Sequence, residues 1–185
     1  DPEIAVPARQ LSDARRRLYA GPEGRVAGLI PGAAYGPSKR WPPGHFAELG
    51  RRLAKALDTR IAVFGTADER DICRTVAGEI GPAALDLGGG TSLEELTAML
   101  AACRVVVSND CGGMHLAAAV GTPVVAVFGI TDPAKTGPLG KARRIIAAEG
   151  GSRSRDVKRR SREAADCLRS IDPARVLEAA VELAR

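Results

Sequence analysis

Paired glycines, an acid, a thiol and a histidine directly follow a valine-rich run in the middle of the chain. The segment reads SNDCGGMH and occupies residues 108–115. Glycines in the first turn of a helix leave the backbone N–H groups accessible, and a helix N-terminus attracts anions. We therefore expect residues 108–115 to form an anion-binding turn, with His115, one helical turn further on, as a candidate donor to a phosphate. The structural alternative is a tight connection in which Asp110 only caps the helix.

A rigid loop at residues 31–42, PGAAYGPSKRWP, contains the second group of reactive side chains. It leaves an apolar run and ends in two adjacent cations and the single tryptophan of the chain. Lys39 could place a compact charge on a phosphate, and a charge-assisted hydrogen bond of this kind contributes about 1.5–3 kcal/mol. The alternatives are that Lys39 is an ordinary surface lysine and that Trp41 with Pro42 simply anchors the helix that follows.

Two further segments, FGTADE at residues 64–69 and GTS at residues 90–92, also follow apolar runs. A carboxylate in such a place can accept hydrogen bonds from both hydroxyls of a ribose, which makes Asp68 and Glu69 candidates. Alternatively, the two acids only favour the start of a helix. The sequence contains neither a GxxxxGK[ST] loop nor a GxGxxG turn that opens a helix, so a nucleotide would be held by another device.

These residues must be positioned by an alternation of short apolar runs and amphipathic segments. The predicted strands cover residues 25–30, 60–64, 84–87, 105–107, 124–128 and 143–147. The predicted helices cover residues 43–57, 67–79, 114–120, 160–168 and 173–183, the last with Asp172 as its N-cap. Another helix begins after Thr91 or Ser92, one of which is its N-cap. Runs of β-branched residues that are hydrophobic throughout are typical of strands buried on both faces. The pattern predicts an α/β fold, a Rossmann-like open parallel sheet with helices on both faces and ligands at the carboxyl ends of its strands.

Composition excludes several classes of protein. The chain has 185 residues, with 27 Lys and Arg against 22 Asp and Glu, and its formal charge is +5. A hydrophobic share of 45% excludes a disordered chain. No apolar run approaches the roughly 18 residues that a membrane helix needs. With only three Phe, two Tyr and one Trp, a base-stacking surface is not expected, and neither is a nucleic-acid partner. Four widely spaced cysteines predict free thiols and a cytoplasmic protein.

Charge is concentrated in residues 141–162, where nine basic residues stand against two acids. A solvated surface is the plain interpretation, and a face turned toward a polyanion or the inner membrane is the alternative. The chain opens on Asp1-Pro2-Glu3 without an initiator methionine, so we expect a piece of a longer protein.

The segments PGAAYGPSKRWP, FGTADE and SNDCGGMHLAAAVGTP together resemble the ADP-heptose:lipopolysaccharide heptosyltransferases, a glycosyltransferase family. The resemblance covers residues 28–140, resumes at residues 167–177, and is strongest to the heptosyltransferase II branch. It implies the C-terminal half of a GT-B enzyme. Residues 1–24 would be the interdomain linker and lead-in helix, and residues 25–185 the Rossmann-like domain that binds the nucleotide sugar. The N-terminal domain, which holds the acceptor and the general base, would be absent.

The resemblance also implies a role for each residue at the phosphate end. Lys39 would contact the donor phosphates and stabilise the leaving group. Asp110, Cys111 and Gly112 would form the pyrophosphate turn, with His115 behind it. Many relatives have Thr or Ser where Cys111 stands, but the backbone N–H is retained, so we expect binding to survive.

At the nucleoside end, the resemblance implies that Glu69 binds the ribose and that Thr91 approaches the adenosine through its backbone. Ala34 and Tyr35 match positions where relatives can offer hydroxyls to the phosphates, a contact that Ala34 cannot make. No obligatory cofactor or metal is implied, although Mg²⁺ could assist.

The expected activity is inverting transfer of heptose from ADP-heptose to the lipopolysaccharide inner core, at the cytoplasmic face of the inner membrane. Two alternatives keep the fold. One is the donor domain of a different glycosyltransferase or of a sugar-nucleotide epimerase, and the other is a non-catalytic nucleotide-binding module. A third alternative is a nucleic-acid-binding module that uses residues 141–162.

Overall fold

In the computed structural model of the chain, residues 3–19, 25–140, 142–149, 158 and 160–185 are described. Within them, six parallel strands form one sheet in the order β3-β2-β1-β4-β5-β6. The strands are β1 (Val26–Ile30), β2 (Arg60–Val63), β3 (Ala84–Asp86), β4 (Val106–Asn109), β5 (Val124–Phe128) and β6 (Arg143–Ala147). This strand order is that of a doubly wound nucleotide-binding fold. The predicted parallel sheet is therefore confirmed.

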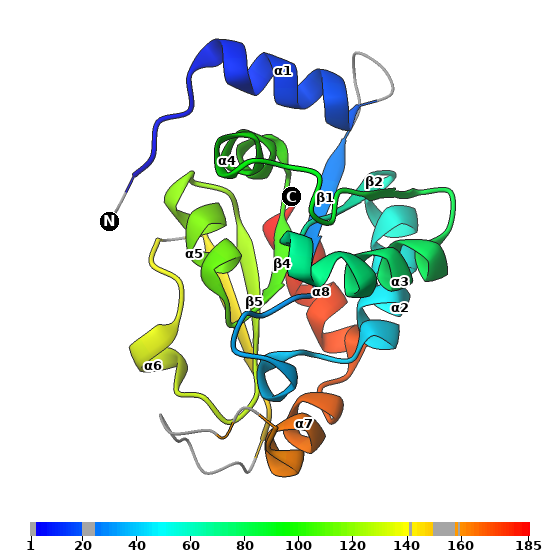
Figure 1. Cartoon of the computed structure of the whole chain (residues 1–185), viewed down its shortest axis with the longest axis vertical. Coiled ribbons are helices and arrows are strands. Elements are labelled where there is room, and N and C mark those ends of the chain that lie inside the picture. Colours follow the sequence, from blue (N-terminus) through cyan, green and yellow to red (C-terminus); the bar gives the residue numbers. More distant parts are fainter. Residues whose placement is uncertain (1–2, 20–24, 141, 150–157, 159) are drawn as a thin grey trace.

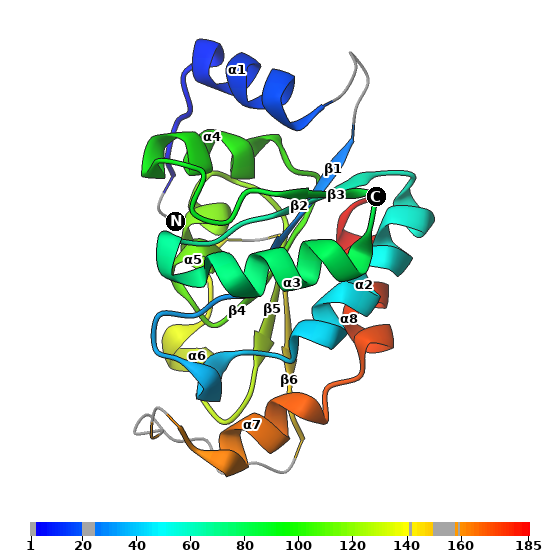
Figure 2. The same ribbon diagram turned by 45° about the vertical axis from the view of Figure 1, so that its right-hand side comes forward.

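Helices cover both faces of this sheet, as expected. Figures 1 and 2 show α4 and α5 on one face, with α1 outside α4, and α2, α3 and α8 on the other. The longer helices are α1 (Ala8–Leu18), α2 (Pro43–Leu57), α3 (Arg70–Ile80), α4 (Leu93–Ala102), α5 (Gly112–Ala119), α7 (Arg162–Arg169) and α8 (Pro173–Leu183). The short helical turns are η1 (Pro37–Lys39), η2 (Ala67–Glu69) and α6 (Pro133–Thr136).

The strands are buried on both faces because their apolar residues point alternately to the two helical layers. In β1, Ala27 and Leu29 join the cluster formed with α2, α3 and α8. Val26 and Ile30 join the opposite cluster, which includes residues of α1, α4 and α5. All five residues of β1 are buried. This two-sided burial is why the strand runs are hydrophobic throughout instead of alternating.

Helix starts largely follow the capping residues of the sequence. Asp172 caps α8 by accepting a hydrogen bond from the Ala174 amide at 2.8 Å, and Pro173 occupies the first helical position. Of the two candidates for the cap of α4, the residue is Ser92, whose Oγ accepts from the Glu95 amide at 3.1 Å.

One difference from the predicted elements concerns β4, which continues to Asn109 although the apolar run ends at Val107. Ser108 and Asn109 are both fully buried, and their polar side chains are hydrogen-bonded within the protein. A polar pair can extend a buried strand only when such partners are present, which a hydrophobic pattern cannot reveal.

Smaller differences lie at element ends. The predicted helix over 67–79 starts as the 3₁₀ turn η2 before α3, and α5 starts at Gly112 rather than Met114. The short α6 was not predicted. No helix among the described residues is long and apolar enough to cross a membrane. Part of the predicted linker and lead-in helix lies outside the described residues, namely residues 1–2 and 20–24. The same holds for residues 141, 150–157 and 159 of the basic segment.

Candidate functional site

The candidate residues follow the carboxyl ends of β1, β2, β3 and β4, along one edge of the sheet. Because the sheet order places β1 beside β4, the strand order reverses between these two strands. In doubly wound folds this switch point is where ligands bind. From β3 to β4 there are three inter-strand steps, about 14 Å in all at about 4.8 Å each. Loops arranged over that distance suit an extended ligand.

The loop after β1 is fixed to β4 by one buried amide. Asn109 donates from Nδ2 to the carbonyl oxygens of Pro31 and Gly32 at 2.8 and 3.3 Å. Its Oδ1 accepts from the Trp41 backbone N–H at 2.9 Å. Both ends of residues 31–41 are thus held by one side chain. Sequence reasoning quoted Asn109 within its motif but assigned it no role. The signal it offered was an amide side chain directly after a buried strand.

Trp41 has the structural role that was considered as the alternative for it. The side chain is fully buried, and its indole N–H donates to the Ile171 carbonyl at 3.1 Å. Its ring lies edge-on to Phe46 with 5.0 Å between centroids, which ties the loop to the start of α2. Trp41 therefore anchors the loop and does not face a ligand.

Lys39 and Asp110 meet at the switch point. Lys39 Nζ lies 2.6 Å from Asp110 Oδ2, and the two side chains are only 19% and 7% exposed. The ammonium is also 5.6 Å from the centroid of the Tyr35 ring, which lies on the exposed part of the loop together with Ala34. Lys39 is thus not an ordinary surface lysine, because its partly buried ion pair with Asp110 fixes the position of the ammonium group.

The structural alternative for Asp110 is wrong. The N-cap of α5 is Cys111, one residue later. The Asp110 carboxylate instead turns to Lys39. A helix cap contributes about 1 kcal/mol. Leaving the partly buried Lys39 ammonium without a counter-charge would cost more than that, so the ion pair is favoured over the cap.

The start of α5 is open on one side. A Cβ built on Gly112 would meet no atom within 4 Å, and the residue is exposed. A Cβ on Gly113 would instead lie 2.7 Å from Ile30 Cδ1, so the second glycine serves the packing of α5 on β1. His115 is exposed in the first turn of the same helix. The N–H groups at this end can therefore be approached by an anion at Gly112.

The thiol of Cys111 is not suited to nucleophilic chemistry. Burial raises the pKa of the Cys111 thiol, although its hydrogen bond with the Ser108 side chain opposes the shift. Its Sγ lies 3.3 Å from Ser108 Oγ. Since the thiolate is the nucleophilic form, we assign the thiol no chemical role; Cys111 stands at the N-cap position of α5 without a side-chain cap hydrogen bond.

Glu69 lies between the ends of β1 and β2. Its Oε2 accepts from the Thr66 amide at 3.0 Å, which closes the turn η2, so the expected structural role at a helix start is present. The side chain is nevertheless 8% exposed and directed at the loop after β1. A Cβ on Gly32 would fall 2.2–2.5 Å from three Glu69 carboxyl atoms. Only a glycine at position 32 leaves room for this carboxylate.

Thr91 lies on the loop after β3, two strands away from β1, and is half-buried. That loop contains three consecutive glycines, of which Gly89 donates its N–H to the Gly65 carbonyl at 2.8 Å. The loops after β2 and β3 are therefore joined. Lys39, Asp110 and Gly112 form one end of the site, and Glu69 and then Thr91 follow along the sheet edge.

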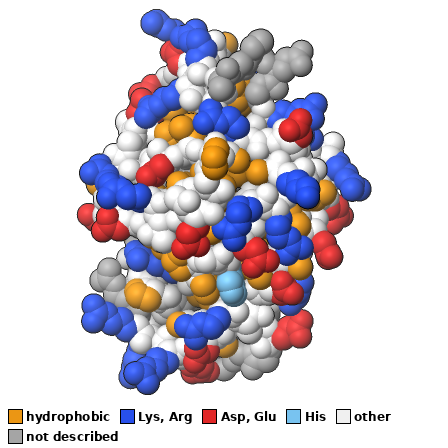
Figure 3. All heavy atoms as spheres, turned by 90° about the vertical axis from the view of Figure 1, so that its right-hand side faces the viewer, with side chains coloured by type: hydrophobic (Ala, Val, Ile, Leu, Met, Phe, Trp, Pro, Cys, Tyr) orange, Lys and Arg blue, Asp and Glu red, His pale blue; other side chains and the backbone are white. Residues whose placement is uncertain are grey.

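Charge elsewhere on the surface is mixed. Figure 3 shows the side of the molecule on which α2 and α3 lie, where lysines and arginines are interspersed with aspartates and glutamates. The partly buried Lys39 in the loop after β1 is therefore a more specific feature than the overall charge of +5.

Residues 2–165 match the model of glycosyltransferase family 9 (heptosyltransferase). The chain belongs to this family. Lipopolysaccharide heptosyltransferase 2 of Escherichia coli K12 is 32% identical over an alignment of 185 positions that covers 96% of this chain and 52% of that protein. Lipooligosaccharide heptosyltransferase 2 of Haemophilus influenzae is 36% identical over 148 residues, 78% of this chain and 42% of the relative. The chain spans about half the length of these heptosyltransferases.

Solved structures of heptosyltransferases agree with the fold. E. coli ADP-heptose lps heptosyltransferase II matches with a TM-score of 0.83 at 31% identity, over 99% of this chain and 53% of that one. E. coli heptosyltransferase WaaC with ADP matches with a TM-score of 0.60 at 29% identity, over 74% of this chain and 42% of that one. The expected resemblance to the heptosyltransferases and the expected half of a GT-B structure are confirmed.

Proposed function

We propose that this chain is the donor-binding domain of a heptosyltransferase that transfers heptose from ADP-heptose to the lipopolysaccharide inner core. The observation that carries the proposal is the Lys39–Asp110 pair, 2.6 Å apart, beside the open start of α5 at the switch between β1 and β4. Related structures support the choice of nucleotide, because E. coli heptosyltransferase WaaC was solved both with ADP and with ADP-2-deoxy-2-fluoro heptose.

In this proposal, the diphosphate occupies the end of the site at Lys39 and Gly112. The Lys39 ammonium and the N–H groups of Cys111 and Gly112 bind the phosphate oxygens, with His115 as a further donor. Asp110 keeps Lys39 in place when the donor is absent. Because Asp110 is itself an anion, the phosphates share the ammonium with it, and the open helix start contributes the remaining hydrogen bonds.

The nucleoside would extend from the diphosphate toward β3. Glu69 would accept from the ribose hydroxyls, since its carboxylate already lies at the carboxyl end of the sheet, against Gly32. The backbone near Thr91 would contact the adenosine. Ala34 and Tyr35 would line the loop side of the phosphates, and Ala34 contributes no hydroxyl there.

The chemical step gives the donor domain one task. An acceptor hydroxyl attacks the anomeric carbon from the face opposite the ADP, the bond to the β-phosphate oxygen breaks, and negative charge grows on the departing phosphate. Lys39 and the amides of α5 stabilise that charge, and they accelerate transfer to the extent that they bind it better than the ground state. A carboxylate on a second domain would take the proton of the acceptor, so we expect the 185-residue chain alone to transfer no sugar.

Calorimetric titration of the chain with ADP, UDP and GDP tests the proposal. We expect binding of ADP with a clear preference over the other two, and at least a several-fold loss of ADP affinity in Lys39→Ala. Lys55→Ala, which removes an exposed lysine of α2, is the matched control and should bind ADP like the wild type. A preference for UDP would favour the domain of another glycosyltransferase or epimerase. Equal affinities of the two variants would remove Lys39 from the phosphate site.

A further inference from the structure

The loop at residues 88–90 consists of three glycines, and its three carbonyl oxygens are all held by arginine side chains. Arg70, at the start of α3, donates from Nε to Gly88 O at 3.4 Å and from Nη2 to Gly89 O at 3.3 Å. Arg17, from α1, donates from Nη2 to Gly90 O at 2.6 Å. The contact from Arg17 is much the shortest of the three. Two helices on different sides of the loop therefore fix it.

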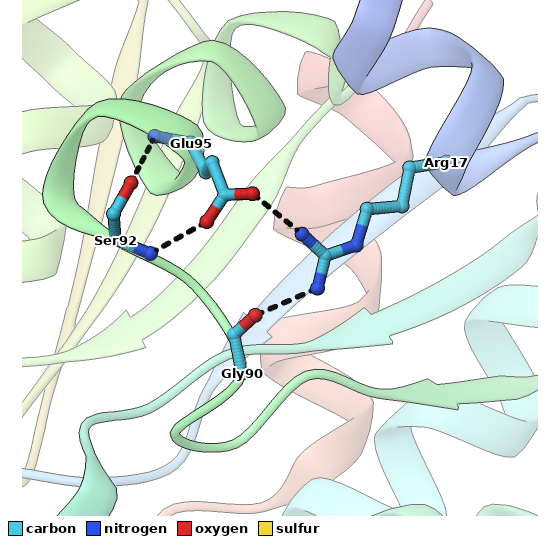
Figure 4. A network of polar contacts seen from close by, with 4 residues as sticks. All are labelled: Arg17, Gly90, Ser92 and Glu95. Atoms are coloured by element: carbon cyan, nitrogen blue, oxygen red, sulfur yellow. Dashed lines mark hydrogen bonds and ion pairs between the residues drawn. The ribbon is translucent and has the colours of Figure 1, made fainter.

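Arg17 makes a second contact that connects the loop to α4. Its Nη1 lies 2.9 Å from Glu95 Oε1. Glu95 in turn accepts from the Ser92 amide at 2.7 Å with its other oxygen, and Ser92 Oγ accepts from the Glu95 amide. Figure 4 shows this arrangement, in which one guanidinium joins the loop carbonyl to the capping box of α4. The residues Arg17, Gly90, Ser92 and Glu95 are called the Arg17 clamp below.

The clamp is presented by a helix that is itself firmly packed. Leu18 and Ala14 of α1 are buried in the cluster that contains α4. Tyr19 donates its hydroxyl to the Ala102 carbonyl at the end of α4 at 2.7 Å. The Arg17 side chain is therefore held in position by its helix, although it is 42% exposed.

An exposed ion pair adds little to global stability. The Arg17 clamp instead helps to order the three glycines of residues 88–90. Glycine loses more backbone freedom than any other residue when it is fixed. A loop that is ordered before the ligand arrives spares the ligand the cost of ordering it. The effect of Arg17 should consequently appear in ligand affinity and local backbone protection rather than in the melting temperature.

We propose that Arg17 is a positioning residue for the nucleoside end of the donor site, so that α1 helps to set the affinity for the nucleotide. This inference rests on the proposed function, because it takes the loop before Thr91 to receive the adenosine. Arg17 touches no substrate in this proposal and acts only through Gly90 and Glu95. The segment before β1 thereby becomes part of the donor site's support rather than only a connection.

The test compares Arg17→Met, which keeps an apolar stem, with Arg16→Met. Arg16 is the neighbouring exposed arginine of α1, and its ion pair is with Asp13 of the same helix. Adenosine and ADP are titrated against each variant. We expect Arg17→Met to lose affinity for both ligands by about the same factor, roughly five-fold or about 1 kcal/mol. Arg16→Met should match the wild type, and Arg17→Lys should recover part of the loss because it keeps a charged donor.

Hydrogen exchange of residues 88–92 in the ligand-free variants provides the independent readout. Arg17→Met should exchange several-fold faster there than Arg16→Met, at an unchanged melting temperature. Unchanged exchange and unchanged affinity in Arg17→Met would overturn the inference, as would a loss for ADP but not for adenosine. Failure of the wild-type chain to bind ADP would instead overturn the proposed function, and the exchange data would still report on the clamp.

Discussion

At the scale of single residues, the candidate site combines a paired ammonium group with a backbone segment that solvent can reach. Lys39 is held by Asp110 in a partly buried pair, whereas Gly112 has open space beside its Cα. The two features have different consequences for substitution. In the proposed function, removing the Lys39 charge would remove a ligand of the diphosphate, while adding atoms at Gly112 would limit how close the diphosphate can come.

Gly112→Ala should separate binding from folding. Since an added Cβ meets no protein atom within 4 Å, we expect folding to be unaffected or slightly stabilised, by up to about 1 kcal/mol from helix propensity. In the proposed function the methyl group would occupy the space of the diphosphate, and we expect ADP affinity to fall about ten-fold, or 1.4 kcal/mol. Calorimetry measures the affinity and thermal unfolding the stability.

Gly44→Ala is the matched control, because a Cβ there also meets nothing within 4 Å and the residue lies at the start of α2, outside the site. Equal ADP affinity in Gly112→Ala and Gly44→Ala would show that the diphosphate does not approach the start of α5.

Ser38, next to Lys39, offers a stability prediction. Its side chain is 2% exposed, and its Oγ has no hydrogen-bond partner among the described residues. A buried hydroxyl without a partner costs about 1–3 kcal/mol in desolvation. We therefore expect Ser38→Ala to raise the free energy of unfolding, by about 1 kcal/mol, in urea titrations. A lower stability of Ser38→Ala would mean that the hydroxyl has a bound water or another acceptor.

At the scale of elements, Asn109 joins β4 to both ends of the loop after β1. Asn109→Ala would leave the Trp41 N–H and the carbonyls of Pro31 and Gly32 without their partner, and each buried unpaired group costs about 1–3 kcal/mol. We expect a loss of about 3 kcal/mol in the free energy of unfolding, measured by urea denaturation. Thr75→Ala on the exposed face of α3 serves as the control. A loss below about 1 kcal/mol in Asn109→Ala would show that the loop is held by other contacts.

The start of α4 carries a pH dependence. The hydrogen bond from the Ser92 amide, aided by Arg17, lowers the pKa of Glu95 from its ordinary value of 4.5. Because the pKa is lower in the folded state, Glu95 stabilises the fold fully above about pH 4.5, and this contribution is lost as pH falls through the lowered pKa.

The melting temperature of the wild type should therefore fall below about pH 4.5 more steeply than that of Glu95→Gln. Glu178→Gln, which changes an exposed glutamate of α8, should follow the wild-type profile. Identical profiles for wild type and Glu95→Gln would contradict the lowered pKa.

At the scale of the whole molecule, the sheet separates two hydrophobic clusters, and a buried cysteine lies in each. Cys73 belongs to the cluster with α2, α3 and α8, and Cys103 to the cluster with α1, α4 and α5. Burial raises the pKa of both thiols to about 12. At pH 8 both are neutral in the native state, and a thiol reagent reaches them only after the structure opens.

If the domain unfolds as one unit, Cys73 and Cys103 should be labelled with the same dependence on urea concentration. Mass spectrometry of peptides after pulse labelling measures the two rates. The matched variants Cys111→Ser and Cys167→Ser remove the two less buried thiols from the analysis. Faster labelling of Cys103 at low urea would show that the α1–α4 face opens by itself.

The chain by itself determined the features that depend on neighbouring residues. The uniformly apolar strand runs, the capping positions of α4 and α8, and the paired glycines after β4 all act over a few residues. For that reason the parallel sheet, its two helical layers and the glycine-rich turn between β4 and α5 could be predicted, whereas phosphate binding at that turn stays a prediction. The boundary of β4 could not, because its last two residues are polar and depend on partners elsewhere.

Only the tertiary structure decided how the site is held together. Lys39 and Asp110 are 71 residues apart, and Arg17 and Gly90 are 73 apart. Asn109 likewise reaches back to Pro31 across the crossover. Such pairs carry no periodic pattern, since each depends on which strands become neighbours and on the register between them. Asp110 could therefore be expected at the candidate site from its motif. That its carboxylate pairs with Lys39 instead of capping α5 depends on the folded sheet, which brings the two residues together.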